Sequence, residues 1–305
     1  MNFTVEWAIS WNSPINTKDN TTSIRGVTPA VVKIYSFEGN QQITNAPSKQ
    51  VGISEAACPL TSYNSHNEIN WNQWLAGLID GDGYLGLSRF GYACLEITMD
   101  LKDEHALQQI KHKLGGSVKL RAGSKSVRYR LHHKKGMMDL IYRINGHIRN
   151  SIRVEQLKKL CDKYNIEFIE ASLFTSESID NGWFAGFFDA DGTITFSIKK
   201  NVPQLTISVT NKKEINVIDY KTVFGGNIYF DISQNGYYKW SIQSQKDVLN
   251  ILEYFKKHPS RSSKKNRLHL VPLYYSLKKI KAYSPENEVL FKAWQQFKKK
   301  WDKRS

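Results

Sequence analysis

Two ten-residue segments carry the side chains best suited to chemistry. Trp74–Gly83 reads WLAGLIDGDG, and Trp183–Gly192 reads WFAGFFDADG, 109 residues further along. Each segment reads as an apolar helix that ends in a carboxylate, Asp82 in the first and Asp191 in the second. Because a carboxylate at the C-terminal end of a helix faces the negative end of the helix dipole, two such ends brought together repel each other. A divalent cation between them would remove that cost.

Small residues in both segments predict that the two helices cross at close range. Gly77 and Gly81 lie four residues apart in the first segment, and Gly186 and Ala190 do so in the second. Residues at this spacing share one face of a helix, and without bulky side chains they let a partner backbone approach. We therefore expect these four positions to form a helix–helix interface.

The duplication extends well beyond the two segments. Glu104 and Glu214 are 110 residues apart, as are Gly115 and Gly225. In the first copy we expect helices at 71–82, 103–114, 136–144 and 154–164, and strands at 84–88, 95–99, 117–121 and 126–132. In the second copy the matching strands are 194–198, 205–209, 227–232 and 237–243. This order predicts an α+β fold in which two pseudo-symmetric αββαββα repeats form a saddle of two antiparallel sheets around a paired-helix core.

The composition divides the chain into four regions. Residues 1–66 are rich in Asn, Ser, Thr, Gly and Pro without helical or strand periodicity, which predicts a poorly ordered leader or linker. The first repeat is expected at 67–170 and the second at 171–285. Residues 286–305 end in a run of lysines and are expected to form a basic C-terminal tail.

The charge balance favours a polyanionic partner. The chain has 43 Lys and Arg against 28 Asp and Glu, a net charge of +15. Most of the excess lies in residues 256–305, which hold 15 basic and three acidic residues. Nucleic acid is therefore the first candidate partner, and an anionic membrane surface is the second. No apolar run approaches the ~20 residues needed to cross a bilayer, so we expect no membrane insertion.

The paired segments, with the same order of helices and strands after each, resemble the double-motif LAGLIDADG homing endonucleases encoded in introns. The resemblance covers residues 71–285. It implies a monomeric enzyme that binds a long, asymmetric double-stranded DNA site. It also implies Mg²⁺-dependent cleavage of both strands across the minor groove, which leaves short 3′ overhangs and promotes intron mobility.

The resemblance also implies roles for individual residues. The second acid of each motif, Asp82 and Asp191, is expected to be catalytic and to bind the divalent metal, with Gly81 and Ala190 beside them in the metal site. A basic residue from each repeat is expected to stabilise the developing charge. Lys265 is the first choice in the second repeat and Arg153 in the first.

The first acids of the two motifs are not expected to join this site. Asp80 and Asp189 lie about 200° around the helix from Asp82 and Asp191, given ~100° per residue. We interpret them as capping or structural residues.

The strands predict a surface that could read DNA. Alternation turns Val118, Leu120, Val127, Tyr129 and Leu131 inward in the first repeat, and Ile228, Phe230, Ile232, Tyr238, Trp240 and Ile242 inward in the second. The opposite faces then carry polar side chains that can contact base edges in the major groove. With Lys264 added from the chain beyond the second sheet, the predicted DNA-binding residues are Lys119, Arg121, Arg128, Arg130, His132, Asn227, Tyr229, Lys239, Ser241, Gln243 and Lys264.

Two other motifs are excluded by their context. Asp80-x-Asp82 could open a calcium-binding loop, but the sixth and twelfth positions would be Leu85 and Gly91 where an EF-hand needs Gly and Glu. Gly81-x-Gly83-x-x-Gly86 matches a dinucleotide-binding fingerprint, yet it follows a helix and opens a strand, the reverse of what that site requires. Cys58, Cys94 and Cys161 have neither disulfide nor zinc-ligand spacing.

Two further functions stay open at this point. The same scaffold serves RNA maturases, which assist splicing of the host intron, so intron RNA is a second candidate partner. A DNA-binding module without catalysis is the third candidate. Abundant Asn, Lys and Ile, with no visible signal or transit peptide, lead us to expect an organelle-encoded product, mitochondrial with plastid as the alternative.

Overall fold

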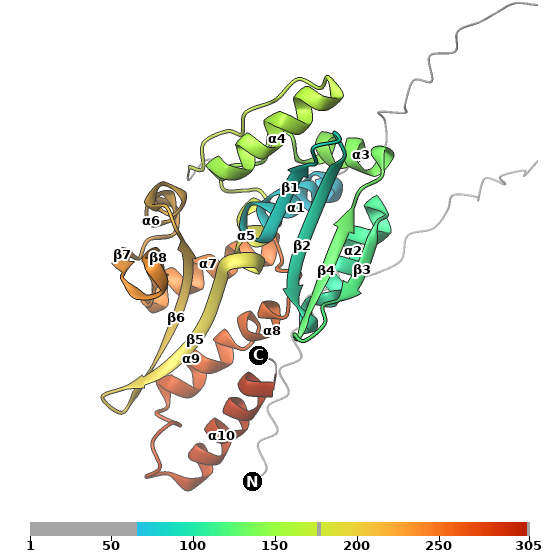
Figure 1. The fold of residues 1–305 in the computed structure, drawn as a ribbon. Helices are drawn as coiled ribbons and strands as arrows, with labels where there is room; N and C mark the ends of the chain where they lie inside the picture. Colours follow the sequence, from blue (N-terminus) through green and yellow to red (C-terminus); the bar gives the residue numbers. More distant parts are fainter. Residues whose placement is uncertain (1–65, 176–177, 304–305) are drawn as a thin grey trace, which may run out of the picture. The chain divides into compact units, whose positions relative to one another are not determined.

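The computed structural model describes residues 66–175 and 178–303, and within them the predicted repeat is observed twice. The expected leader, residues 1–66, lies outside the described residues except for His66, the first residue of a helix. Figure 1 shows two sheets with helices α1 (His66–Asp82) and α5 (Trp183–Asp191) between them. No helix among the described residues is long and apolar enough to cross a membrane.

The two motif helices are buried because they are apolar around most of their circumference. In α1, Trp74, Leu75, Leu78 and Ile79 have at most 1% of their surface exposed, and every residue of α5 from Trp183 to Asp189 is buried. A helix of this kind must be covered on several sides. Each of the two is covered by the other and by the sheet of its own repeat.

All four small residues predicted at the helix crossing lie between α1 and α5. A Cβ added at Gly77 would lie 1.9 Å from the carbonyl oxygen of Trp183, and one added at Gly186 would lie 1.8 Å from that of Trp74. Further along, a Cβ on Gly81 would lie 2.3 Å from the Cβ of Ala190. The two backbones are therefore in direct contact, and no larger side chain fits at these crossing points.

Each motif helix leads directly into a four-stranded antiparallel sheet. The strands of the first sheet, sheet A, are β1 (Gly83–Leu87), β2 (Ala93–Asp100), β3 (Ser117–Leu120) and β4 (Ser126–Leu131). Those of sheet B are β5 (Gly192–Lys199), β6 (Val202–Asn211), β7 (Asn227–Asp231) and β8 (Tyr237–Ile242). The spatial orders, β1-β2-β4-β3 and β5-β6-β8-β7, are the same, which confirms the predicted duplicated α+β fold.

Helices cover the inner faces of both sheets. They are α2 (Glu104–Leu114), α3 (Lys134–Ile144), α4 (Ser151–Tyr164), α6 (Ile218–Phe224), α7 (Gln245–Lys257), α8 (Lys264–Leu268), α9 (Val271–Lys279) and α10 (Glu288–Lys303). The two cores differ in chemistry. Sheet A packs mainly aliphatic side chains, whereas in the second repeat the ring centroid of Phe184 lies 4.6, 6.1 and 5.7 Å from those of Phe224, Trp240 and Tyr254.

The predicted basic C-terminal tail is wrong, because α10 is a packed amphipathic helix. Trp294, Phe297 and Trp301 are at most 4% exposed, and all three contact the ring of Phe196 on β5. These three residues are three and four positions apart, which places them on one face of a helix. A count of charged residues does not reveal this face, because lysines lie between them. Lys298, Lys299 and Lys300 stay exposed around the rest of the helix.

Three of the side chains predicted to face inward are exposed. Leu120 is 67% exposed at the end of β3, Phe230 is 56% exposed near the end of β7, and Ile232, just after β7, is 83% exposed. Both strands lie at the edge of their sheets. Alternation along a strand decides which face a residue takes, but only a covering layer buries it.

We predict that Gly81→Ala lowers the free energy of unfolding by about 1–3 kcal/mol, because the added methyl overpacks the crossing against Ala190. Adding Ala190→Gly to the same chain should restore most of the loss, since the double variant only moves one methyl group from α5 to α1. Urea unfolding of the wild type, both single variants and the double variant measures this coupling.

Gly77→Ala is the matched control, because the obstructing atom there is a backbone oxygen that no side-chain deletion removes. Ala190→Gly should not rescue it. Strictly additive effects of Gly81→Ala and Ala190→Gly would contradict the close crossing.

Candidate functional site

The crossing brings the last residues of α1 and α5 together. Asp82 ends α1 and Asp191 ends α5, and a Cβ on Gly81 would lie 3.3 Å from Oδ2 of Asp191. Among residues 66–175 and 178–303, neither Asp82 nor Asp191 accepts a hydrogen bond or forms an ion pair through its carboxylate. The predicted pair of acids therefore meets at one place with its oxygens uncommitted.

The surroundings of this pair disfavour two negative charges. Desolvation raises the pKa of Asp82 to about 6, although its side chain is still reached by solvent, and Lys264 and Arg153 limit the rise. Desolvation and the charge of Asp82 together raise the pKa of the half-buried Asp191 to about 7. Both carboxylates also face the negative ends of their helix dipoles. A bound cation would oppose all of these effects.

The donor chemistry of the pair fits a hard divalent cation such as Mg²⁺. Carboxylate oxygens are the protein ligands that Mg²⁺ prefers, and it commonly takes only one or two of them, with water and substrate phosphate completing the octahedron. No cluster of three or more His, Cys, Asp or Glu side chains suited to a metal occurs in the described part of the chain. The two acids therefore suit a cation shared with a phosphate-bearing substrate better than a closed protein cage.

Asp80 and Asp189 are buried and lie in a different environment, as their position on the helix predicted. Asp80 accepts a hydrogen bond of 2.8 Å from Nε1 of Trp183, and Asp189 accepts one of 2.9 Å from Nε1 of Trp74. Each acid is thus bonded to the tryptophan that opens the opposite motif helix. We call these two reciprocal interactions the Trp–Asp pairs.

Each of these acids also anchors the loop or helix start that follows the sheet of its own repeat. Asp80 accepts from the backbone N–H of Arg149 at 2.8 Å, and burial raises the pKa of this carboxyl to about 7. Asp189 accepts from the N–H of Arg261 at 2.7 Å and from the hydroxyl of Ser262 at 2.6 Å. Because the anchored segments lead to Arg153 and Lys264, the buried acids help to position these basic side chains.

Lys264 and Arg153 cap the C-terminal ends of the two motif helices. The ammonium of Lys264 donates to the carbonyl oxygens of Phe188, Asp189 and Ala190 at 2.9, 2.7 and 2.8 Å. Nε of Arg153 donates to the carbonyl oxygen of Ile79 at 3.2 Å. Burial lowers the pKa of Lys264, and the neighbouring carboxylates oppose that change. Two fixed positive charges therefore stand beside the Asp82 and Asp191 pair.

Two residue assignments from the sequence change with this geometry. Lys265, the preferred catalytic lysine, is exposed, and it is Lys264, assigned to DNA binding, whose charge acts on both acids. One residue on a helix is a rotation of ~100°, so an error of one position selects the wrong side chain. The carbonyl of Ala190, predicted to lie in the metal site, already accepts from the ammonium of Lys264.

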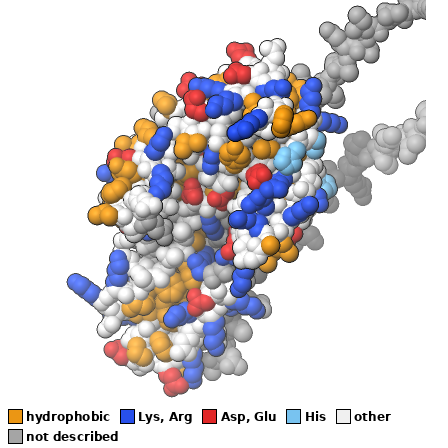
Figure 2. Space-filling view, viewed as in Figure 1, with side chains coloured by type: hydrophobic (Ala, Val, Ile, Leu, Met, Phe, Trp, Pro, Cys, Tyr) orange, Lys and Arg blue, Asp and Glu red, His pale blue; other side chains and the backbone are white. Residues whose placement is uncertain are grey.

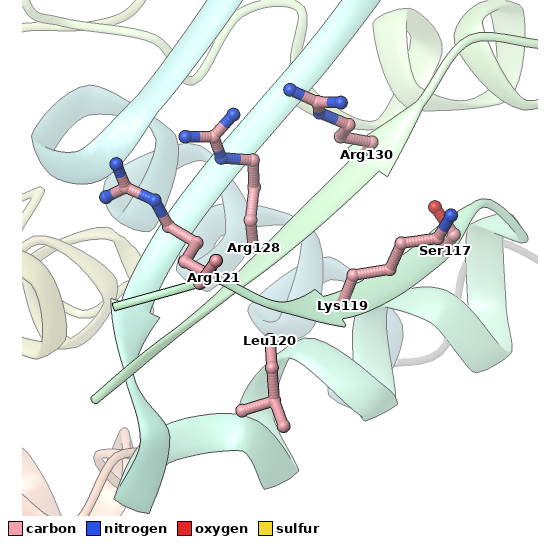
Figure 3. Close-up of a pocket in the computed structure, with 7 residues that line it drawn as sticks. Ser117, Lys119, Leu120, Arg121, Arg128 and Arg130 are labelled. Atoms are coloured by element: carbon pink, nitrogen blue, oxygen red, sulfur yellow. The ribbon is translucent and has the colours of Figure 1, made fainter. Parts of the chain in front are cut away.

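The outward face of sheet A is strongly basic. Figure 3 shows the guanidinium groups of Arg121, Arg128 and Arg130 on one side of β3 and β4, with Leu120 on the other, and Figure 2 shows Lys and Arg side chains gathered over this sheet. These arginines, with Lys119, line a cavity of about 300 Å³. Glu96 on β2 lies 3.0 Å from Nε of Arg130 and 3.4 Å from a terminal nitrogen of Arg128. His132 is exposed just beyond β4.

The outward face of sheet B is less charged, and one predicted residue is not on its surface. Asn227, Tyr229 and Gln243 are exposed, and Lys239 is half-buried. Ser241, predicted to contact DNA, is 6% exposed, and it pairs in register with Asn227 on β7 and Ser208 on β6.

Sequence reasoning assigned no role to several residues that build the site. Trp74 and Trp183 are the first residues of the two motifs, and they are 109 residues apart, as the acids are. This repetition is the sequence signal that could have identified them. Glu96 and Ser262 carry no such signal, because their roles depend on which strands and loops become neighbours.

The sequence and the fold of this chain are both similar to those of known proteins. Residues 75–164 and 184–275 match the family described as LAGLIDADG endonuclease. The probable intron-encoded endonuclease aI2 of Debaryomyces hansenii is 46% identical over 278 residues, 85% of this chain and 42% of the relative. The intron-encoded RNA maturase bI4 of Saccharomyces cerevisiae is 45% identical over 314 residues, 90% of this chain and 49% of the relative.

The intron-encoded DNA endonuclease ai2a of Dictyostelium discoideum is 37% identical over 245 residues, 78% of this chain and 77% of that protein. The chain thus spans less than half the length of the first two relatives. Among solved structures, the LAGLIDADG homing endonuclease I-LtrWI bound to target DNA has a TM-score of 0.57 at 16% identity, over 75% of this chain and 96% of that chain. At that identity the likeness concerns the fold.

The acid pair predicts a pH-dependent effect of Mg²⁺ on stability. Carboxyls whose pKa is raised by folding hold protons that the unfolded chain has lost, so stability falls as pH rises from about 4 to about 7. Because Mg²⁺ binds the ionised acids, it should raise the thermal unfolding midpoint clearly at pH 8 and little at pH 5.

Scanning calorimetry with Mg²⁺ and with EDTA at both pH values measures this difference. The double variant Asp82→Asn/Asp191→Asn should lose the Mg²⁺ response at pH 8. An undiminished response in that variant would place the cation elsewhere.

Proposed function

The chain belongs to the LAGLIDADG endonuclease family, and we propose that it is a site-specific homing endonuclease that makes a metal-dependent double-strand break in a long DNA target. The observation that supports this most directly is the meeting of Asp82 and Asp191 at the ends of two crossing helices, each of which leads into a sheet with a polar outward face. The I-LtrWI structure, with the same fold, is described as bound to its target DNA.

In this proposal Asp82 and Asp191 are the residues that would hold Mg²⁺ at the cleavage site. When bound, the metal supplies Lewis-acid stabilisation of the phosphate oxygens and a water that can act as nucleophile. The chain's own contribution is to hold the two carboxylates together at the helix crossing, and a bound cation would favour their ionised form. Since α1 and α5 each supply one carboxylate, one acid is available from each repeat.

Lys264 and Arg153 add positive charge where phosphoryl transfer develops negative charge. Their bonds to the carbonyl oxygens of α5 and α1 fix them before substrate arrives, so no reorganisation is needed during the reaction. Such preorganised charge is typically the largest single contribution of a protein to catalysis. With Lys264 and Arg153, the proposed site has one acidic and one basic side chain from each repeat.

The two outward sheet faces would bind the DNA on either side of the acid pair. Antiparallel strands fit the major groove, and Lys119, Arg121, Arg128 and Arg130 can contact phosphates and base edges there. Because one chain supplies both sheets and both acids, we propose that it acts as a monomer. A monomer with two different faces suits a target whose halves differ.

A second candidate function is assistance of intron splicing. It is favoured by the similarity to the RNA maturase bI4 and by the exposed lysines of α10, which lie outside both sheets. An intron-encoded origin, expected from composition to be mitochondrial, fits either function. Splicing of the host intron with wild-type protein and with Asp82→Asn would separate the two, because splicing does not require the acid pair.

We predict that Asp82→Asn or Asp191→Asn reduces double-strand cleavage to the uncatalysed background while duplex binding is retained. Each substitution removes one negative ligand from the proposed metal site but keeps the side chain's size. Cleavage of a selected duplex with Mg²⁺ and binding of the same duplex in EDTA give the two measurements. Asp162→Asn, at an exposed acid on α4, is the control and should cleave normally; full cleavage by both motif variants would refute the proposed site.

We further predict different outcomes for two adjacent lysines. Lys264→Met should slow cleavage on the order of 10²-fold, as the loss of one preorganised charge does elsewhere. Lys265→Met should cleave like the wild type, because Lys265 is exposed. Single-turnover cleavage rates provide the comparison, and unfolding curves show whether the loss of the α5 cap alone accounts for the Lys264 result. If Lys265→Met slowed cleavage and Lys264→Met did not, Lys265 would be the catalytic lysine.

A further inference from the structure

The outward faces of the two sheets have the same backbone and different chemistry. The strand registers allow them to be compared position by position, because Gly83 and Gly192 follow the two motif acids and pair with Ile97 and Val209. From these anchors, Tyr129 on β4 corresponds to Trp240 on β8. Any difference between corresponding positions is then a difference in what the two faces can recognise.

In sheet A, the neighbouring strands β2 and β4 build one charged cluster, the Arg–Glu cluster, which consists of Glu96, Arg128 and Arg130. Glu96 pairs directly with Arg130 across β2 and β4, and its carboxylate contacts both arginines. Arg130 uses Nε for this contact, so in the described structure its two terminal nitrogens keep their donors for a ligand. Nε of Arg128 is buried without a hydrogen-bond partner, which leaves a further donor unsatisfied.

In sheet B, the corresponding positions are neutral or occupied by a single lysine. The position of Glu96 is taken by Ser208 and that of Arg130 by Ser241, and these two serines pair in register and are 2% and 6% exposed. Lys239 takes the place of Arg128, and Tyr229 that of Lys119. Lys199 and Asp231, at the ends of β5 and β7, are the other charged side chains on this face, and most of the remaining polar ones are hydroxyls and amides. These hydroxyls and amides are Thr193, Thr195, Ser197, Gln204, Thr206, Asn227 and Gln243.

The carboxylate in the Arg–Glu cluster argues for base contacts over phosphate contacts. A phosphate would be repelled by Glu96, and a face built for phosphate alone gains nothing from an acid between two arginines. A carboxylate that contacts both guanidinium groups instead limits their orientations, which favours the planar, two-bond contact of Arg with the O6 and N7 atoms of guanine. Glu96 itself can accept from N4 of the cytosine in such a pair.

We propose that the DNA target is asymmetric in base composition: the half-site against sheet A presents guanines to the Arg–Glu cluster, and the half-site against sheet B presents A·T pairs to a face of hydroxyls and amides. Asn and Gln pair with adenine, and the methyl group of Thr packs on that of thymine. This inference rests on the proposed function, since it concerns the substrate of the same enzyme.

The test is a binding selection from a pool of duplex DNA with 24 randomised base pairs, performed with the full chain in EDTA so that cleavage does not remove selected sites. We expect one half of the selected consensus to carry guanine at two or more positions that the other half lacks. The double variant Arg128→Gln/Arg130→Gln should lose guanine at those positions and bind the wild-type consensus roughly ten- to hundredfold more weakly.

Lys239→Gln is the matched control, because it is the equivalent of Arg128 on the other sheet. It should change preference only in the half without the guanines. Circular dichroism of both variants establishes that the fold is kept.

The outcomes separate this inference from the proposed function. A consensus with guanine equally in both halves, or guanine positions that survive the double arginine variant, overturns the asymmetry and leaves the endonuclease proposal standing. Failure of the wild type to enrich any sequence overturns both.

Discussion

The whole site depends on direct backbone contact between α1 and α5. With glycine at positions 77 and 186, each helix lies against a carbonyl oxygen of the other. This contact brings the helix ends, and so Asp82 and Asp191, to a common place. The Trp–Asp pairs secure the same contact from both sides, since each buried acid bonds the tryptophan of the opposite helix. Packing of the core and geometry of the site are therefore set by the same interface.

This arrangement has an electrostatic cost that the chain reduces only in part. Two carboxylates face the negative ends of two helices, and their raised pKa values record the desolvation. Lys264 and Arg153 offset some of that cost by capping the same helix ends. A bound cation would offset the remainder, because its positive charge opposes the repulsion between the two carboxylates and their oxygens are uncommitted.

Duplication has kept the backbone of the two repeats while their side chains have diverged. The strand orders and registers match, yet the second core is filled with aromatic rings and the first outward face with arginines. The buried side of each sheet can change as long as volume is conserved. The outward side is free of packing constraints, so it can adapt to whichever half of a target it meets. A single chain with two such faces need not recognise a palindrome.

The sequence by itself determined the repeated elements and the acids. Apolar helices, alternating strands and glycines at a four-residue spacing follow from local physics, and their repetition 109 to 110 residues apart predicted the paired architecture. The separation of Asp82 from Asp80 around the helix was also predictable, because helix geometry fixes it.

Only the tertiary structure decided which side chains reach the site and which are covered. Lys264 rather than Lys265 faces the acids, Ser241 is buried, Leu120 and Phe230 are exposed, and α10 packs against β5. Each of these depends on what lies opposite a residue in space. Spacing along a chain gives the direction of a side chain, whereas burial and electrostatic contact require a second segment whose position no local pattern encodes.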